Sequence, residues 1–251
     1  MTQSLDILMQ KTGLWRASRI DCEYKSVRST GFKVLDDELP GGGWPSEGVT
    51  ELLHDQYGIG ELRLLLPTIT QLSQGLTRWL LMVNPPYIPY PPTLAQAGVD
   101  LSKIIVSQTK TVTDYLWAIE KALSSQSCSL VLCWPRKIHA KQIKRMQVAS
   151  KEGNCWAILF RPGNAATHSS PADLRIQLRP SESKQNNSTL IARVLKRKGG
   201  WGSRDLLLEF SDRLQEPMPE FSKLNIEQPE RHLEFRLQKN DQQHPPAHEY
   251  Q

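Results

Sequence analysis

Short apolar runs of strand length alternate with segments of helical spacing through the middle of the chain. In the helical segments, apolar residues recur every three or four positions, as on one face of an α-helix. Strands that alternate with helices predict an α/β fold, with a mostly parallel central sheet flanked by helices. The predicted strands are Val49–His54, Arg78–Asn84, Lys103–Ser107, Leu130–Trp134 and Trp156–Phe160. The predicted helices are Leu62–Leu72 (with a kink at Pro67), Leu94–Ala97, Thr113–Ser124 and Ala140–Lys151.

The pattern changes after Pro171, where apolar and polar residues alternate with period two, as is typical of half-exposed strands. We expect these segments to form antiparallel strands at one edge of the sheet. They are Leu174–Leu178, Ser188–Lys196 and Leu206–Phe210. Beyond residue 215 apolar residues are few, so we expect a flexible tail. The predicted parts are an N-terminal segment with a glycine-rich loop (1–45), the core (46–215) and an acidic, disordered tail (216–251).

Composition excludes several classes of protein. The 251 residues are 39% hydrophobic and 23% charged, an ordinary balance for a folded domain. No apolar run reaches about 18 residues, and the first ten residues do not resemble a secretion signal. We therefore expect a cytoplasmic protein without a membrane span. The four cysteines form no CxxC pair and the histidines share no ligand spacing, which disfavours a disulfide framework and a metal site.

Charge is distributed unevenly along the chain. The formal net charge is +5, yet the tail from Glu216 onward holds four Lys or Arg against seven Asp or Glu. A basic body with an acidic tail fits a partner that carries phosphates, and it fits equally a protein that is simply soluble. Within the body, Lys137, just before the predicted helix Ala140–Lys151, and Lys141, Lys144 and Arg145 within it fall roughly on one helical face, which we interpret as a solvent-facing surface.

Several ordered blocks carry a resemblance to a known family. They include Trp15–Ser18, Leu39–Pro45 (LPGGGWP), Gly58–Pro67, Asn84–Tyr90 and Lys196–Gly200. Together they resemble the RecA-like ATPase core and, within it, the ImuA family, whose members are associated with translesion DNA synthesis. The related SulA family of cell-division inhibitors is similar only over about residues 51–178. It lacks the glycine-rich block and the later basic segment, so ImuA is the closer match.

The resemblance to ImuA implies a non-catalytic, RecA-like accessory protein of the SOS response to DNA damage. Its partners would be ImuB, a catalytically inactive Y-family polymerase homologue, and an error-prone DnaE-type polymerase, with DNA as a further candidate. The alternative is a SulA-like inhibitor that binds the tubulin-like division protein. A third class, the ATP-driven recombinase, requires an intact nucleotide site.

The nucleotide site that this resemblance implies lacks its essential residues. A phosphate-binding loop follows the pattern GxxxxGK[ST], in which Lys neutralises phosphate charge and the hydroxyl holds magnesium. Asp55 replaces the first glycine, Glu61 the lysine and Leu62 the hydroxyl, while Gly58 and Gly60 remain. A glutamate in place of lysine turns an attraction of about 4 kcal/mol at about 4 Å into a repulsion of that order.

Two further positions agree with the loss of the nucleotide site. The apolar strand that would end in a magnesium-binding Asp ends in Trp134 and Pro135. The segment where the catalytic Glu would lie begins at Asn84 and contains no carboxylate. We therefore expect no ATP hydrolysis, no bound cofactor and no enzyme activity.

Basic residues cluster around a glycine-rich turn near the end of the predicted core. Basic side chains beside an aromatic residue can hold a phosphate backbone and stack a base. A solvated hairpin whose tryptophan covers the sheet edge is the alternative interpretation. The candidate DNA-binding residues are Arg193, Lys196, Arg197, Lys198, Trp201 and Arg204.

Four apolar residues are candidates for protein contacts. Trp44 follows three glycines and is either a plug for the core or an exposed anchor. Leu233, Phe235 and Leu237 lie in the acidic tail, and short apolar segments of such tails often fold on binding. An inert, solubilising tail is the alternative. We interpret the proline-rich segment 85–92 as a rigid connector rather than a polyproline ligand.

Overall fold

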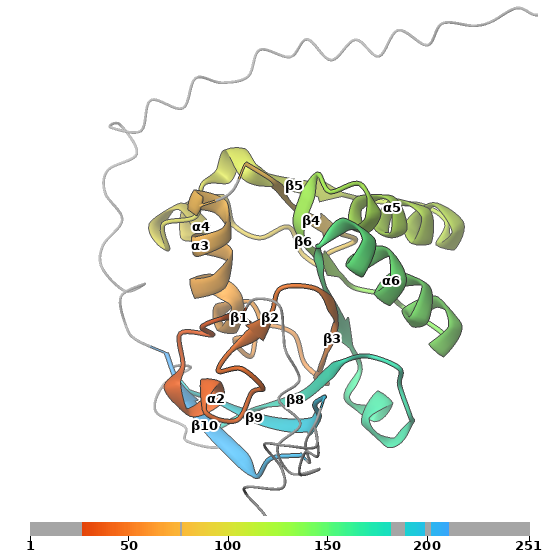
Figure 1. Cartoon of the computed structure of the whole chain (residues 1–251). Helices are drawn as coiled ribbons and strands as arrows, with labels where there is room; N and C mark the ends of the chain where they lie inside the picture. Colours follow the sequence, from red (N-terminus) through yellow and green to blue (C-terminus); the bar gives the residue numbers. More distant parts are fainter. Residues whose placement is uncertain (1–26, 76, 182–188, 199–201, 211–251) are drawn as a thin grey trace, which may run out of the picture. The chain divides into compact units, whose positions relative to one another are not determined.

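An eight-stranded sheet forms the centre of the part of the chain that the computed structural model describes, residues 27–75, 77–181, 189–198 and 202–210. The strands are β3 (Gly48–Leu53), β4 (Trp79–Val83), β5 (Ile104–Ser107), β6 (Cys128–Cys133), β7 (Trp156–Arg161), β8 (Leu174–Pro180), β9 (Thr189–Lys196) and β10 (Asp205–Glu209). Their order is β10–β9–β8–β3–β7–β6–β4–β5 (Figure 1). Strands β3 to β8 pair in parallel, and β9 and β10 extend the sheet antiparallel beyond β8. The expected parallel sheet with an antiparallel edge is confirmed.

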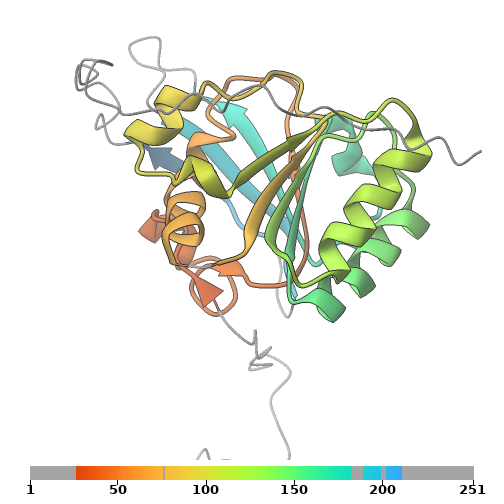
Figure 2. The ribbon, with the colours of Figure 1, turned by 90° about the horizontal axis from the view of Figure 1, so that it is seen from above.

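Helices cover both faces of this sheet. They are α2 (Lys33–Asp36), α3 (Leu66–Gly75), α4 (Pro91–Gln96), α5 (Val112–Ser124) and α6 (Ala140–Gly153), with the short 3₁₀ turns η2 (Arg63–Leu65), η3 (Leu101–Lys103) and η4 (Gly163–Thr167). Figure 1 and Figure 2 show α5 and α6 side by side on one face, with α3 and α4 on the other. The predicted order of strands and helices is therefore also the observed order.

The central strands are buried on both faces, which explains their nearly continuous apolar sequences. Because side chains alternate across a strand, Ala157 and Leu159 of β7 pack in the core beneath α5 and α6. Ile158 and Phe160 of the same strand pack in the other core, which includes residues of α3. The sheet thus separates two hydrophobic cores, one beneath each layer of helices.

The glycine-rich block belongs to the fold. A short antiparallel pair joins β1 (Val27–Arg28) to β2 (Trp44–Pro45). A Cβ atom at Gly43 would collide with the carbonyl oxygen of Arg28, so this close approach of the two segments requires glycine. Trp44 is fully buried, and its ring lies 5.3 Å from that of Trp156 between the centroids. Of the two roles expected for Trp44, the structure therefore shows the first: its side chain fills the core.

The segment with Pro67 differs from the expected kinked helix. The structure divides it into the 3₁₀ turn η2 and the α-helix α3, which begins at Leu66. Pro67 is the second residue of α3, in the first turn, where backbone N–H groups have no partner within the helix. Proline thus helps to begin the α-helix instead of bending it.

A buried carboxylate connects the three strands at the centre of the sheet. Glu51 of β3 has a fully buried side chain and accepts from Arg161 of β7 at 2.5 Å and from Arg175 of β8 at 2.6 Å. The hydroxyl of Ser170 donates to the same carboxylate at 2.8 Å. Arg175 is itself buried and donates to two backbone carbonyls, of Ala165 and His168. Buried charges are tolerated in this way when they are paired and fully hydrogen-bonded.

Glu51→Ala is expected to lower the free energy of unfolding by about 3–5 kcal/mol, because it leaves the buried Arg175 guanidinium without its counter-charge. Urea unfolding followed by circular dichroism measures this loss. The matched control is Asp37→Ala, which breaks the exposed Lys33–Asp37 pair and should cost less than about 0.5 kcal/mol. Equal effects of the two substitutions would contradict the role given to Glu51.

Candidate functional site

The loop between β3 and η2 occupies the position of the nucleotide-binding loop that the sequence resemblance implied. Glu61 is buried here, and its Oε1 atom accepts the backbone N–H of Gly58 at 2.9 Å. The backbone N–H of Gly58 is thus bound by a carboxylate of the same loop. The Oε2 atom of Glu61 is also buried and has no hydrogen-bond partner among the described residues.

Further contacts make this loop a closed structural unit. Asp55 accepts the backbone N–H of Gly163 at 3.0 Å, so the loop is tied to the segment that follows β7. Gly60 has a φ of +107°, and a Cβ atom there would lie 2.6 Å from the ring of Phe210. Leu62 packs against the hydrophobic core. With Glu61 in place of the lysine, these residues do not fit a nucleoside triphosphate, and we derive no nucleotide chemistry from them.

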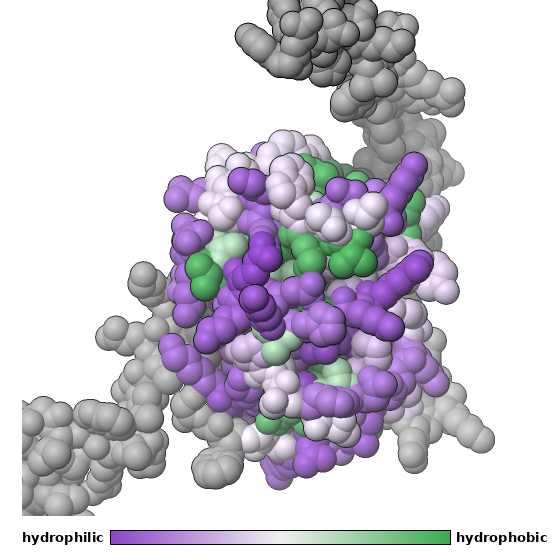
Figure 3. Space-filling view, turned by 90° about the vertical axis from the view of Figure 1, so that its right-hand side faces the viewer, coloured by the Kyte–Doolittle hydropathy of each residue, from purple (hydrophilic) through white to green (hydrophobic). Residues whose placement is uncertain are grey.

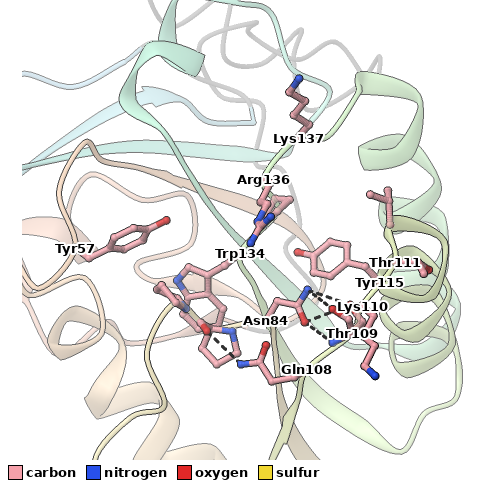
Figure 4. A pocket seen from close by; sticks show the side chains of 14 residues that line it. Tyr57, Asn84, Gln108, Thr109, Lys110, Thr111, Tyr115, Trp134, Arg136 and Lys137 are labelled. Carbon is pink, nitrogen blue, oxygen red and sulfur yellow. Dashed lines mark hydrogen bonds between the residues drawn. The ribbon is translucent and has the colours of Figure 1, made fainter.

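A cleft of about 510 Å³ opens beside this loop, at the carboxyl ends of β4, β5 and β6 (Figure 4). Asn84 follows β4 in the left-handed backbone conformation, with φ 52°. Its side-chain oxygen accepts the backbone N–H of Thr109 at 2.7 Å, and its amide donates to the hydroxyl of Thr109 at 3.0 Å. These hydrogen bonds join the ends of β4 and β5 and fix one wall of the cleft.

The opposite wall of the cleft is aromatic and basic. Trp134 follows β6 and stacks on Phe160, with ring centroids 4.5 Å apart. Next along the chain, Arg136 and Lys137 are exposed and line the cleft. The positions where a magnesium-dependent ATPase needs carboxylates thus hold an amide, at Asn84, and an indole. In the part of the chain that the structure describes, no cluster of His, Cys, Asp or Glu side chains suits a metal ion.

Exposed aromatic and aliphatic side chains lie on the two segments next to the cleft, and we call this group of residues the aromatic ridge. It consists of Tyr57 of the degenerate loop and Tyr87, Ile88 and Tyr90, which follow β4. The exposed fractions are 75% for Tyr87, 69% for Ile88 and 61% for Tyr90. The rings of Tyr57 and Tyr87 meet edge to face at 6.5 Å between centroids. Sequence reasoning treated residues 85–92 as a connector and missed this surface, although three large apolar residues between prolines were the available signal.

The candidate DNA-binding residues are partly used by the fold. Arg197 pairs with Glu38 and donates to its carbonyl oxygen, and Lys196 donates to the carbonyl of Ser170 at 2.8 Å. Arg193, Lys198 and Arg204 are exposed near the ends of β9 and β10. DNA binding at this edge stays a prediction. The remaining candidates lie outside the described residues: Trp201, Leu233, Phe235 and Leu237.

The basic face of α6 is an ordinary solvated surface. Arg145 pairs with Glu120 of α5 at 2.6 Å, and Lys141 and Lys144 are exposed. Figure 3 views the molecule from the side of α5 and α6 and shows mainly hydrophilic residues with small apolar patches. This agrees with the interpretation made from the sequence. None of the described helices combines the length and the apolar character that crossing a membrane requires.

The fold and the site define an α/β protein with an exposed aromatic ridge and a basic cleft at the carboxyl edge of its sheet, and with a loop after β3 that is closed by Glu61. The family "Cell division inhibitor SulA" matches residues 48–157. The cell division inhibitor SulA of Yersinia enterocolitica is 30% identical over 116 residues, which are 46% of this chain and 68% of that protein. The chain belongs to the SulA family.

A second curated relative agrees with this assignment. SulA of Photorhabdus laumondii is 34% identical over 116 residues, which cover 46% of this chain and 65% of that protein. The chain therefore spans just under two thirds of the length of this relative. The crystal structure of SulA from Pseudomonas aeruginosa is 25% identical, with a TM-score of 0.39, over 45% of this chain and 98% of that one.

These matches correct the function and partners expected from the sequence. The relatives are named as inhibitors of cell division, so the expected adaptor for ImuB and a DnaE-type polymerase is wrong. The physical reason lies in the two blocks that favoured ImuA. Trp44 of the glycine-rich block is buried, and Arg197 of the basic segment is paired with Glu38. Both blocks contribute to the fold, so their presence does not by itself identify a binding partner.

Adding magnesium to ATP is expected to leave the melting temperature of the full-length protein unchanged, because the loop holds Glu61 in place of the lysine and lacks magnesium ligands. Differential scanning fluorimetry with ATP, in EDTA and then in excess magnesium, measures the effect. A ligand present at about 100 times its Kd would stabilise the protein by about 2.7 kcal/mol, which is a shift of several degrees. A rise in the melting temperature that depends on magnesium would contradict the interpretation that this loop does not bind a nucleotide.

Proposed function

We propose that this chain is a non-enzymatic inhibitor of cell division, which binds the tubulin-like division protein and prevents its polymerisation as part of the response to DNA damage. The observation that carries the proposal is the family match, which covers β3 to the start of β7 and so contains the degenerate loop, the cleft and the aromatic ridge. The surfaces most suited to protein contacts thus lie within the segment shared with named inhibitors.

The aromatic ridge is the proposed contact surface for this partner. Large exposed side chains on a rigid base are enriched at the centres of protein interfaces, where they lose little conformational freedom on binding. Pro85, Pro86 and Pro89 restrict the backbone between the ridge residues. Tyr57 is also held in position, because its ring packs edge to face on the ring of His54, a buried residue that directly follows β3.

We further propose that the core, residues 46–215, is a RecA-like domain whose nucleotide site has become structural. A strand, a glycine-containing loop and a helix follow one another in β3, residues 54–62 and η2–α3, as in a P-loop unit. Glu61 binds the loop N–H of Gly58 in place of a phosphate. Inhibition by such a domain needs only binding, so the proposed activity requires no catalytic residue.

The parts outside the matched segment suggest an extended branch of the family. Residues 27–47 and 158–210 add the β1–β2 pair, α2 and strands β8 to β10 around the matched core. Leu35 of α2 and Leu208 of β10 are buried in the same hydrophobic core. We propose that these additions stabilise the core, as do residues 39–45 and the described residues Lys196 and Arg197 of the two ImuA-like blocks.

Expression of the wild-type chain in undamaged cells of its own species is expected to produce filaments, and the double variant Tyr87→Ala/Ile88→Ala is expected to lose this effect. Removing two anchors of an interface typically costs at least about 2 kcal/mol, or roughly 30-fold in affinity. Cell length measured by microscopy at matched expression, confirmed by immunoblot, checks the result.

The matched control is Leu207→Ala, which removes an aliphatic side chain of 50% exposed fraction on β10, outside the ridge. This variant should cause filaments as the wild type does. Circular dichroism of both purified variants establishes that each is folded. Normal cell length with the wild-type chain would overturn the proposed function, and full activity of the ridge variant would overturn the proposed contact surface.

A further inference from the structure

The cleft lies at a change of direction in the sheet. Strands β4 and β6 are neighbours, yet β4 leads to α4 on one face and β6 leads to α6 on the other (Figure 2). In open α/β sheets, ligands bind in the crevice that such diverging connections leave at the carboxyl ends of the strands. Residues following β4 and β6 form much of the cleft wall, with others following β5.

The charges around this cleft are of one sign. Lys110, Arg136 and Lys137 are exposed and line it, and none of the three forms an ion pair with a carboxylate among the described residues. The lining contains no Asp or Glu. Asp114, in the first turn of α5, is the nearby acidic group on that helix, and its carboxylate accepts from the hydroxyl of Thr111 at 2.7 Å. The cleft therefore favours an anion and offers no ligands for a metal ion.

A buried donor points into the same space. Tyr115 of α5 is only 5% exposed, and its hydroxyl has no hydrogen-bond partner among the described residues. The thiol of Cys133 lies next to this hydroxyl and is only a weak hydrogen-bonding partner for it, which a ligand oxygen can replace. Figure 4 shows the hydroxyl directed into the cleft. Burial raises the pKa of Tyr115, so the hydroxyl keeps its proton and is available to donate to a ligand oxygen.

The size and the apolar walls of the cleft indicate that a ligand bound there carries a planar ring as well as an anionic group. Its volume of about 510 Å³ lies within the range of small-molecule sites. Tyr57 supplies an exposed aromatic surface suited to a planar ring, and the largely buried Trp134 and the prolines at 85, 86 and 135 complete the apolar lining. The exposed basic groups lie in the same cleft, so a phosphate and a ring can be bound together.

We propose that this cleft binds an organic phosphate of mononucleotide size without a metal ion. Arg136, Lys110 and Lys137 neutralise the phosphate, the Tyr115 hydroxyl donates to a ligand oxygen, and the aromatic wall contacts the ring. The site adjoins the loop at residues 54–62, which contributes Tyr57 to its wall, but it does not use the backbone N–H of Gly58 that Glu61 binds. It shares Tyr57 with the aromatic ridge and is tested without the division protein.

Isothermal titration calorimetry of the full-length protein in EDTA tests the site with AMP, ADP and inorganic phosphate as probes. We expect AMP and ADP to bind with a Kd below about 1 mM and inorganic phosphate at least about tenfold more weakly, because it lacks the ring. Affinity should fall as salt rises and should be unchanged when magnesium replaces EDTA.

Variants separate the proposed groups. Lys110→Ala/Arg136→Ala should weaken AMP binding at least about tenfold, and Tyr115→Phe, which keeps the ring and its packing, about three- to tenfold. The control Lys144→Ala removes an exposed charge of α6 outside the cleft and should leave the affinity unchanged. Circular dichroism confirms the fold of each variant, and the double variant changes exposed side chains alone.

Four results would overturn the inference. The first two are the absence of any heat of binding up to about 10 mM AMP and an equal affinity of the wild-type protein for AMP and for inorganic phosphate. The third is an equal affinity of the double variant and the Lys144→Ala control for AMP. The fourth is loss of AMP binding in Glu61→Ala, which leaves the cleft residues unchanged. A short peptide of alternating Glu and Tyr is titrated as a further probe. Binding of this peptide in the absence of AMP binding would assign the cleft to an acidic protein segment and would also overturn the proposal.

Discussion

The buried carboxylate of Glu51 is the interaction on which the arrangement of the sheet depends. It lies on β3, the strand between β7 and β8, and pairs with one arginine from each neighbour. Such a pair adds little net stability compared with an apolar core, but an unpaired buried arginine is very costly, so alternative registers are disfavoured. The register fixed in this way sets the end of β3, and with it the position of the loop that carries Glu61 and Tyr57.

The carboxyl edge of the sheet carries charges of both signs in separate places. The loop after β3 contains the buried Glu61 carboxylate, whereas the cleft beside it is lined by Lys110 and Arg136. Tyr87 and Ile88 lie beside them as exposed apolar contacts. One edge of the sheet therefore combines a closed loop, a basic cleft and an aromatic ridge. This combination suits the binding of a partner or ligand.

The order and type of most elements could be predicted from the sequence, because the apolar runs of buried parallel strands are distinctive. The predicted strand Val49–His54 differs from β3 by one residue at each end. The kink at Pro67 was wrong because the position of a proline within a helix depends on where the α-helix begins, and helix boundaries are the least certain part of such predictions.

Other features could not be predicted because they depend on tertiary structure. The cleft combines residues from four separate segments, and the partner of Tyr57, Tyr87, is 30 positions away in the chain. The buried position of Trp44 and the pairing of Arg197 with Glu38 also depend on long-range contacts. Those two blocks resemble ImuA in sequence, and sequence alone did not distinguish a block that packs in the fold from one that binds a partner. That is why the partner prediction was wrong although the parallel sheet with its antiparallel edge was predicted correctly.

The central claim is that this chain blocks polymerisation of the tubulin-like division protein by direct binding. The most direct measurement is light scattering of that purified protein, from the same species and with its nucleotide, at increasing concentrations of this chain. The account predicts that polymer falls in proportion to added chain and is abolished near a one-to-one ratio, with no consumption of ATP. Undiminished polymer at a severalfold excess of the folded chain would contradict it.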